Sequence, residues 1–164
     1  MSGWHINLDG DWQRSGFDQT ELSDEGIEVG HSERLVAETL LVAVLTYIGG
    51  KILDQATDEA LTRGIHKLAT FARSKKRRLL LELEARDVDP RVKAVFARIE
   101  GDGPDDFKAA LKALPNLKAR SEFLLANSAE YVDEVWYVWS DGDWKFTYLL
   151  SEGGNIVEEE PGKD

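Results

Sequence analysis

The chain has 164 residues, enough for one domain or two small ones, and its formal net charge is −11. The absence of cysteine excludes disulfides, thiolate metal sites and cysteine nucleophiles, and five Trp, four Tyr and six Phe exclude a disordered chain. Binding to a phosphate backbone would need a local basic patch, so the charge disfavours nucleic acid as a partner.

The charge is unevenly distributed along the chain. Residues 1–30 hold seven acids and one base, a net charge of −6, and residues 129–164 hold ten acids and two bases, a net charge of −8. The segment between them carries +3, and its densest basic run is Arg73-Ser-Lys-Lys-Arg-Arg78. Two acidic ends therefore flank a weakly basic middle. Charge of this kind affects the choice of partner more than the fold.

Residues 1–30 are predicted to form an acidic hairpin and loop. Residues 3–8 suit a short strand, Asp9-Gly10 suits a turn, and Trp12 suits the start of a return strand. Residues 17–30 are typical of an acidic loop. The N-terminus lacks the basic and apolar segments of a secretory signal, so we expect a cytoplasmic protein.

Residues 31–78 are predicted to form an apolar helix followed by an amphipathic one. Ser32 suits a helix N-cap, and residues 35–48 are almost entirely apolar. The uncharged run from Thr39 to Gly50 is twelve residues long, short of the roughly 20 that cross a bilayer, and is typical of a core helix or an inserted segment. After Gly49-Gly50, apolar residues recur at helical spacing as far as the basic run. The pair suits either one kinked helix or a helical hairpin.

Residues 79–159 are predicted to form an α+β sheet unit. Alternating patterns predict strands over 79–86 and 92–99, then a helical region from Pro104 to Asn127, then three strands within 132–159. The order ββα-βββ indicates an antiparallel sheet with helices on one face, and the helices of residues 32–73 are expected to cover the other. Residues 160–164 form a tail, and we expect the chain from Glu158 to Asp164 to fray, because nothing in it can be buried.

The tetrapeptide Asp-Gly-Asp-Trp occurs twice, at residues 9–12 and 141–144. In the structural interpretation, Asp-Gly makes a turn and Trp opens the following strand. In the functional one, the two aspartates hold Mg²⁺ or Mn²⁺ through oxygen ligands, but such a site needs further carboxylates, so the turn is favoured. Glu82 and Glu84 share one strand face, where they suit acid–base chemistry or, more simply, contact with solvent.

The leading functional hypothesis is a non-enzymatic, acidic interaction protein that binds a basic protein partner. Nucleotide-binding and hydrolase motifs are absent from the sequence, the three histidines are scattered, and we expect no cofactor. An inhibitor, an immunity-type protein or an assembly subunit would fit, and the apolar residues 35–48 suit self-association into a homo-oligomer. The expected partner-binding residues are Trp4, Trp12, Trp136, Trp139, Asp141, Asp143 and Trp144.

Two alternatives stay open at this point. In the first, the protein is membrane-associated: residues 35–53 insert into or lie against a bilayer, and the basic run binds its anionic surface through Arg73, Lys75, Lys76, Arg77 and Arg78. In the second, the protein is a metal-dependent enzyme that uses the Asp-x-Asp aspartates.

Overall fold

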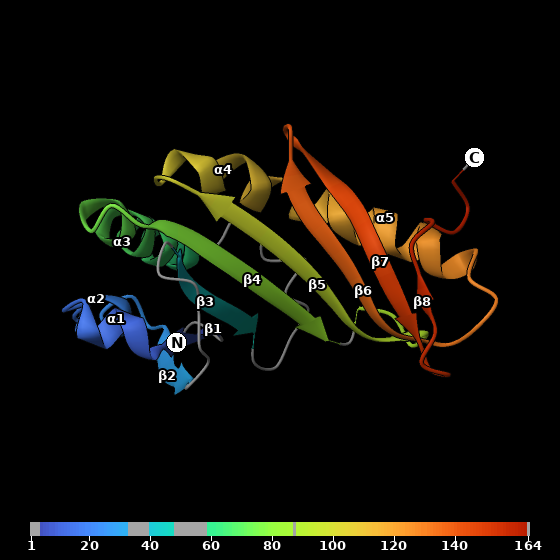
Figure 1. Ribbon diagram of the computed structural model, residues 1–164, viewed down its shortest axis with the longest axis horizontal. Helices are drawn as coiled ribbons and strands as arrows, with labels where there is room; N and C mark the ends of the chain where they lie inside the picture. The colour runs from blue at the N-terminus through green and yellow to red at the C-terminus, as the bar shows by residue number, and fades with distance from the viewer. Residues whose placement is uncertain (1–3, 33–39, 48–58, 87, 164) are drawn as a thin grey trace.

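A computed structural model describes residues 4–32, 40–47, 59–86 and 88–163. These residues form one eight-stranded mixed sheet in the order β2-β1-β3-β4-β5-β6-β7-β8 (Figure 1). The strands are β1 Trp4–Asp9, β2 Glu28–Ser32, β3 Leu40–Tyr47, β4 Arg78–Arg86, β5 Val92–Gly101, β6 Val132–Ser140, β7 Asp143–Ser151 and β8 Ile156–Val157. The helices are α1 Gly10–Arg14, α2 Thr20–Ser23, α3 Glu59–Ser74, α4 Asp105–Lys112 and α5 Leu114–Ala126. The predicted α+β class is confirmed.

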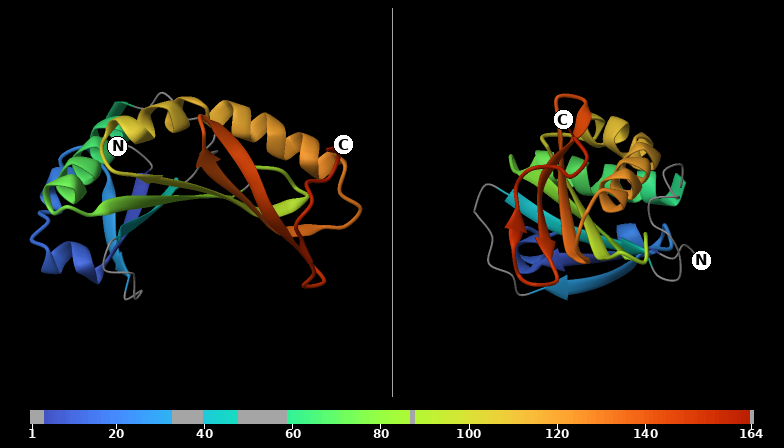
Figure 2. Two further views of the ribbon diagram at one scale, coloured as in Figure 1. Left: turned by 45° about the horizontal axis from the view of Figure 1, so that its top comes forward. Right: turned by 90° about the vertical axis from the view of Figure 1, so that its right-hand side faces the viewer.

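Three parallel strand pairs explain where the helices lie. The pairs β1/β2, β3/β4 and β5/β6 are parallel, and the other neighbours are antiparallel. A parallel pair needs a crossover connection, and helices lie within each of the three. The sheet is therefore mixed, where the sequence predicted antiparallel pairing throughout the sheet unit. It is also strongly arched, with the helices along its convex side (Figure 2).

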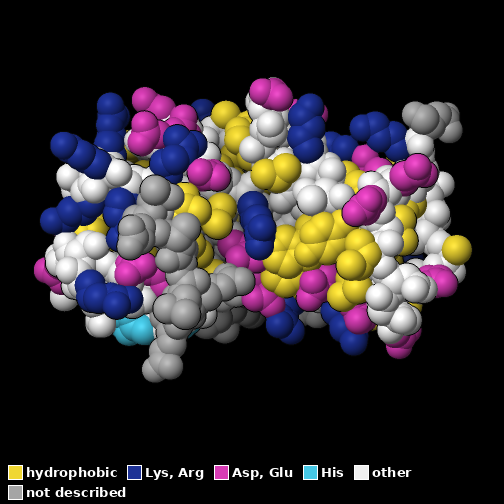
Figure 3. Space-filling view, viewed as in Figure 1, with side chains coloured by type: hydrophobic (Ala, Val, Ile, Leu, Met, Phe, Trp, Pro, Cys, Tyr) yellow, Lys and Arg dark blue, Asp and Glu magenta, His cyan; other side chains and the backbone are white. Residues whose placement is uncertain are grey.

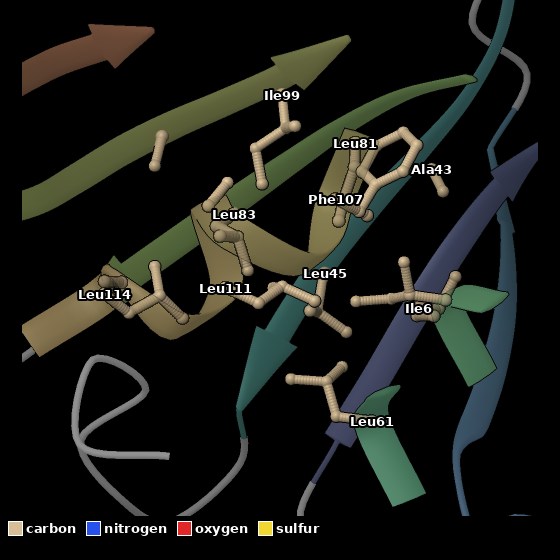
Figure 4. Close-up of a cluster of buried hydrophobic side chains, with 14 of the residues drawn as sticks. Ile6, Ala43, Leu45, Leu61, Leu81, Leu83, Ile99, Phe107, Leu111 and Leu114 are labelled. Carbon is tan, nitrogen blue, oxygen red and sulfur yellow. The ribbon is translucent and has the colours of Figure 1, made fainter. Parts of the chain in front are cut away.

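The hydrophobic core lies between the helices and the convex face of the sheet. Alternate residues of the strands point into it, among them Ile6, Leu45 and Leu81, and they meet Leu61 of α3 and Phe107 of α4 (Figure 4). All five of these side chains are at most 1% exposed. Because α3 and α4 share this face, the prediction that the helices of residues 32–73 cover the opposite face is wrong for α3.

The predicted apolar helix over residues 35–48 is wrong for residues 40–47, which form β3; residues 35–39 and 48 lie outside the described residues. β3 is hydrogen-bonded on both sides, to β1 and to β4, and Leu41, Ala43 and Leu45 are fully buried. The other face of this central strand carries Val42 and Val44, so the strand has a continuous apolar run, which periodicity does not separate from a buried helix. These residues offer neither a helix that inserts into a membrane nor an apolar helix face for self-association.

No helix among the described residues has the length and apolar character needed to cross a bilayer. The α3 helix, predicted to run on from Ile52, is described only from Glu59 and carries its apolar residues on the face toward the sheet. Its polar face holds charged residues, as the sequence predicted.

One residue of the C-terminal segment that was predicted to fray, Glu160, is fixed in the structure. Glu160 forms a two-pronged ion pair with Arg120 of α5, with both N···O distances at 2.8 Å. The Glu160 side chain is only 10% exposed. The arginine fixes the tail because its planar fork matches the two carboxylate oxygens.

Candidate functional site

The concave face of the sheet is the strongest candidate for a functional surface. None of the described helices packs on it, although it spans all the long strands (Figure 2). We call "concave face" the surface of the sheet that points away from the core along β1 and β3 to β7; it includes His5, Asn7, Val42, Val44, Thr46, Leu80, Glu82, Glu84, Phe96, Arg98, Trp136, Val138, Lys145 and Tyr148. These residues alternate with core residues, as a pleated sheet requires, except in β7, where a register shift in the pairing with β6 places Lys145 and Tyr148 three residues apart on this face.

Three aromatic side chains cross the concave face in register on β5, β6 and β7. The ring centroids of Phe96 and Trp136 are 4.2 Å apart with planes 7° from parallel, and those of Trp136 and Tyr148 are 5.8 Å apart at 18°. We call these three residues the aromatic ladder. All three are partly exposed, and Figure 3 shows a continuous hydrophobic patch in this part of the face, bordered by acidic side chains and a basic one.

The central ring of the aromatic ladder is held in place by its neighbours. The indole Nε1 of Trp136 donates a hydrogen bond to Glu134 Oε2 at 2.9 Å. The guanidinium carbon of Arg98 lies 4.5 Å from the ring centroid. A Trp fixed in one orientation loses little side-chain entropy when a partner covers it, and Trp is enriched among residues that dominate binding energy.

The other half of the concave face carries polar side chains together with the apolar Val42, Val44 and Leu80. His5 Nε2 is 3.1 Å from Asn7 Oδ1, and a side chain at Gly30 would clash with that oxygen because its Cβ would lie 2.4 Å away. Glu82 and Glu84 share this face, as predicted from their spacing, but Glu82 is only 4% exposed, so contact with solvent is wrong for it. Glu84 pairs with Arg86 at 2.6 Å.

The structure divides the predicted partner-binding residues. Trp4, Trp12 and Trp144 are at most 1% exposed and belong to the core, whereas Trp136 and Trp139 are partly exposed. Asp141 and Asp143 are exposed in the β6–β7 turn. The N-terminal and C-terminal groups lie at opposite ends of the sheet, so the fold does not bring them together (Figure 1). The sequence reasoning missed Phe96, Arg98 and Tyr148, which only the strand register aligns with Trp136.

The two Asp-Gly-Asp-Trp copies adopt different structures. In the first copy Asp9 is the N-cap of α1, so a return strand at Trp12 is wrong. In the second, Asp141 and Gly142 have φ values of 53° and 75°, which is the hairpin turn that was predicted. Among the residues that the structure describes, no three His, Asp or Glu side chains gather to hold a metal ion.

Replacing Asp9 should destabilise the fold, and replacing Asp143 should not. Asp9 accepts hydrogen bonds from the backbone N–H groups of Asp11 and Val42, and burial raises its pKa. We expect Asp9→Ala to lower the free energy of unfolding by about 1–3 kcal/mol, because it removes a helix cap and leaves a buried N–H unpaired. Exposed Asp143 caps only the neighbouring Trp144 N–H, so Asp143→Ala should cost at most about 0.5 kcal/mol. Urea unfolding measures both; equal losses would contradict the assignment.

Two arginines of the basic run, Arg77 and Arg78, are bonded to other residues within the fold. Arg77 donates to the carbonyl of Leu40 at 2.6 Å and pairs with Asp11 at 3.5 Å. Arg78 pairs with Glu100 at 2.9 Å. Lys76 has a φ of 56° just past the end of α3. The remaining members, Arg73 and Lys75, are exposed.

Comparisons of the chain with protein-family models, with curated proteins and with solved structures gave no match.

Proposed function

We propose that the chain is a non-enzymatic binding protein that docks a basic protein partner on the concave face. The observation that carries this proposal is the aromatic ladder, which presents three aligned, partly exposed rings on a face that no described helix covers. No described element of the chain forms a further layer over these rings, so a binding partner would be needed to bury them. Aromatic residues are enriched at the centres of protein interfaces, as such a partner would require.

The acidic ends of the arch support a basic partner. Asp18, Glu21 and Asp24 are exposed beside and within α2, toward one end of the sheet. Toward the other end, Asp141 and Asp143 are exposed at the β6–β7 turn, and Glu152 is exposed just past the opposite end of β7. These two ends flank the concave face on either side (Figure 2). A partner seated on the aromatic ladder and extending to both ends would meet negative potential there, which speeds association with a basic surface.

The test is affinity capture from a native lysate with the wild-type chain, Trp136→Ala and Phe123→Ala, each quantified by mass spectrometry. Phe123 is the matched control, because it is 59% exposed on α5, outside the concave face. We expect a basic protein that is captured by the wild type and by Phe123→Ala, and released as salt rises. Loss of the central ring should weaken its binding by at least about 2 kcal/mol, or roughly thirtyfold in Kd.

The same experiment overturns the proposal under two results. Equal capture by all three proteins would place the interface elsewhere on the molecule. Capture that depends on Trp136 but retrieves an acidic protein would contradict the basic partner. Thermal unfolding of each variant is measured first, so that a loss of capture is not a loss of fold.

A further inference from the structure

Arg98 is a cation on the concave face without an anionic partner among the described residues. Its guanidinium carbon lies 4.5 Å from the Trp136 ring centroid, and its Nε is buried without a hydrogen bond. Most other described arginines form ion pairs, as do Arg78 with Glu100 and Arg86 with Glu84 at the two ends of β4. A buried N–H donor left unpaired costs free energy, so a group from outside the described chain that paired with this guanidinium would recover part of that cost.

A second arginine of the chain, Arg120, also lies over an aromatic ring, and its guanidinium is paired with a carboxylate. Its guanidinium carbon is 5.7 Å from the Tyr137 centroid. Its Nε and Nη2 each donate to one oxygen of the Glu160 carboxylate at 2.8 Å. A stacked guanidinium keeps its in-plane N–H donors free, and their fork matches two carboxylate oxygens. Arg98 is likewise stacked on an aromatic ring, at Trp136, but its guanidinium has no ion pair with a described carboxylate.

We infer that Arg98 is the receptor for a carboxylate group of the partner that docks on the concave face. This inference rests on the proposed function and names the chemical group that the partner places beside the aromatic ladder. The partner is basic where it meets the ends of the arch. Beside the ladder it presents one carboxylate, from Asp, Glu or its C-terminus. Lys145 lies in the same register row as Arg98, separated from it by Val138 on β6. Lys145 thus adds a second positive charge to this row of the face.

A single negative charge fits this place better than a phosphate. Glu82 lies directly across from Arg98 on β4, and Glu134 bonds the indole of the same Trp136. These carboxylates, together with the net charge of −11, repel a dianion more strongly than a monoanion. The aromatic ladder beside the guanidinium favours a carboxylate attached to an apolar group.

The test is a titration of the full chain with sodium benzoate, followed by NMR of the arginine Nε–Hε signals. Benzoate supplies a carboxylate on a ring, and benzamide is the matched neutral probe. We expect benzoate to shift the Arg98 signal saturably, benzamide to leave it unmoved, and the Arg120 signal to stay in place because Glu160 fills its fork. The Arg98 signal is identified by its disappearance in Arg98→Lys. In Trp136→Ala the benzoate affinity should fall several-fold.

Each other outcome overturns the inference. No saturable shift of the Arg98 signal with benzoate, an equal shift with benzamide, or tighter binding of inorganic phosphate than of benzoate would each do so. The proposed function is judged separately by the capture experiment. If Trp136-dependent capture of a basic protein is found and is unchanged in Arg98→Gln, the docking face stands and the carboxylate receptor is wrong; a benzoate response without that capture would reject the docking function instead.

Discussion

Trp12→Ala is expected to lower the free energy of unfolding by about 3–5 kcal/mol, because it empties a fully buried site. The indole of Trp12 packs edge-on against Phe17, with ring centroids 5.1 Å apart, and stacks on Phe71 of α3 at 5.8 Å. Its Nε1 donates to the carbonyl of Val42 at 2.8 Å, which ties α1 to β3. Removing it therefore loses packing, two aromatic contacts and a buried hydrogen bond together.

Urea unfolding followed by far-UV circular dichroism measures this loss. Trp12→Phe should lose less, about 1–3 kcal/mol, because a ring remains while the hydrogen bond to Val42 is gone. Trp139→Ala is the control, since Trp139 is only partly buried and should cost less than Trp12→Ala. A loss below about 1 kcal/mol in Trp12→Ala would contradict a core role and return Trp12 to the partner-binding residues that its sequence context suggested.

The sequence predicts the elements best where the apolar pattern has one clear period. The alternation from Leu79 to Arg86 predicted a strand that the structure extends by one residue, and the Gly-centred turn at Ser140–Asp143 predicted the β6–β7 hairpin. The failure at β3 has a physical cause, because Val42 and Val44 on the concave face are as apolar as Leu41, Ala43 and Leu45 on the core face, and almost no alternation remains to be seen. Its short length and its Val42, Val44 and Thr46 were the available signals for a strand.

The candidate site was less predictable than the fold. Trp136 was singled out from its acidic, Trp-bearing region, but the same reasoning chose Trp12 and Trp144, which are buried. The two identical Asp-Gly-Asp-Trp tetrapeptides could not be told apart from sequence, although one caps a helix and the other makes a turn. Phe96 and Tyr148 join Trp136 only because β5, β6 and β7 are neighbours in a specific register, which is a long-range property of the fold.

The tail contact suggests how one residue pair fixes the C-terminal end of the chain. Arg120 holds Glu160, donates to the carbonyl of Trp144, and lies over the Tyr137 ring. Burial raises the pKa of Tyr137 to about 12, so this phenol stays neutral beside the pair. We expect Arg120→Ala to lower the free energy of unfolding by about 2–4 kcal/mol, since it leaves a mostly buried carboxylate unpaired and opens a gap over Tyr137.

Glu160→Gln is the matched variant, because it keeps the shape of the side chain and removes only its charge. It should cost about 1–2 kcal/mol at neutral pH, as expected for losing a charged hydrogen bond. Limited proteolysis adds a local readout: both variants should expose the chain after Val157 to cleavage, whereas the wild type should resist. Resistance in Arg120→Ala would contradict the role of the pair in holding the tail.

The dependence on pH separates the charge of Glu160 from its packing. The hydrogen bonds from Arg120 lower the pKa of Glu160 below its ordinary value of 4.5 in the folded chain. A carboxyl with a lowered folded pKa stabilises the fold fully above its unfolded pKa, and this contribution disappears as the pH falls through the folded pKa. The stability gap between the wild type and Glu160→Gln should therefore be constant from pH 7 to about pH 5.5 and should shrink steadily below about pH 4.5. A gap that stays unchanged down to pH 3 would mean that Glu160 acts through packing alone, because the protonated wild-type side chain is then as neutral as glutamine.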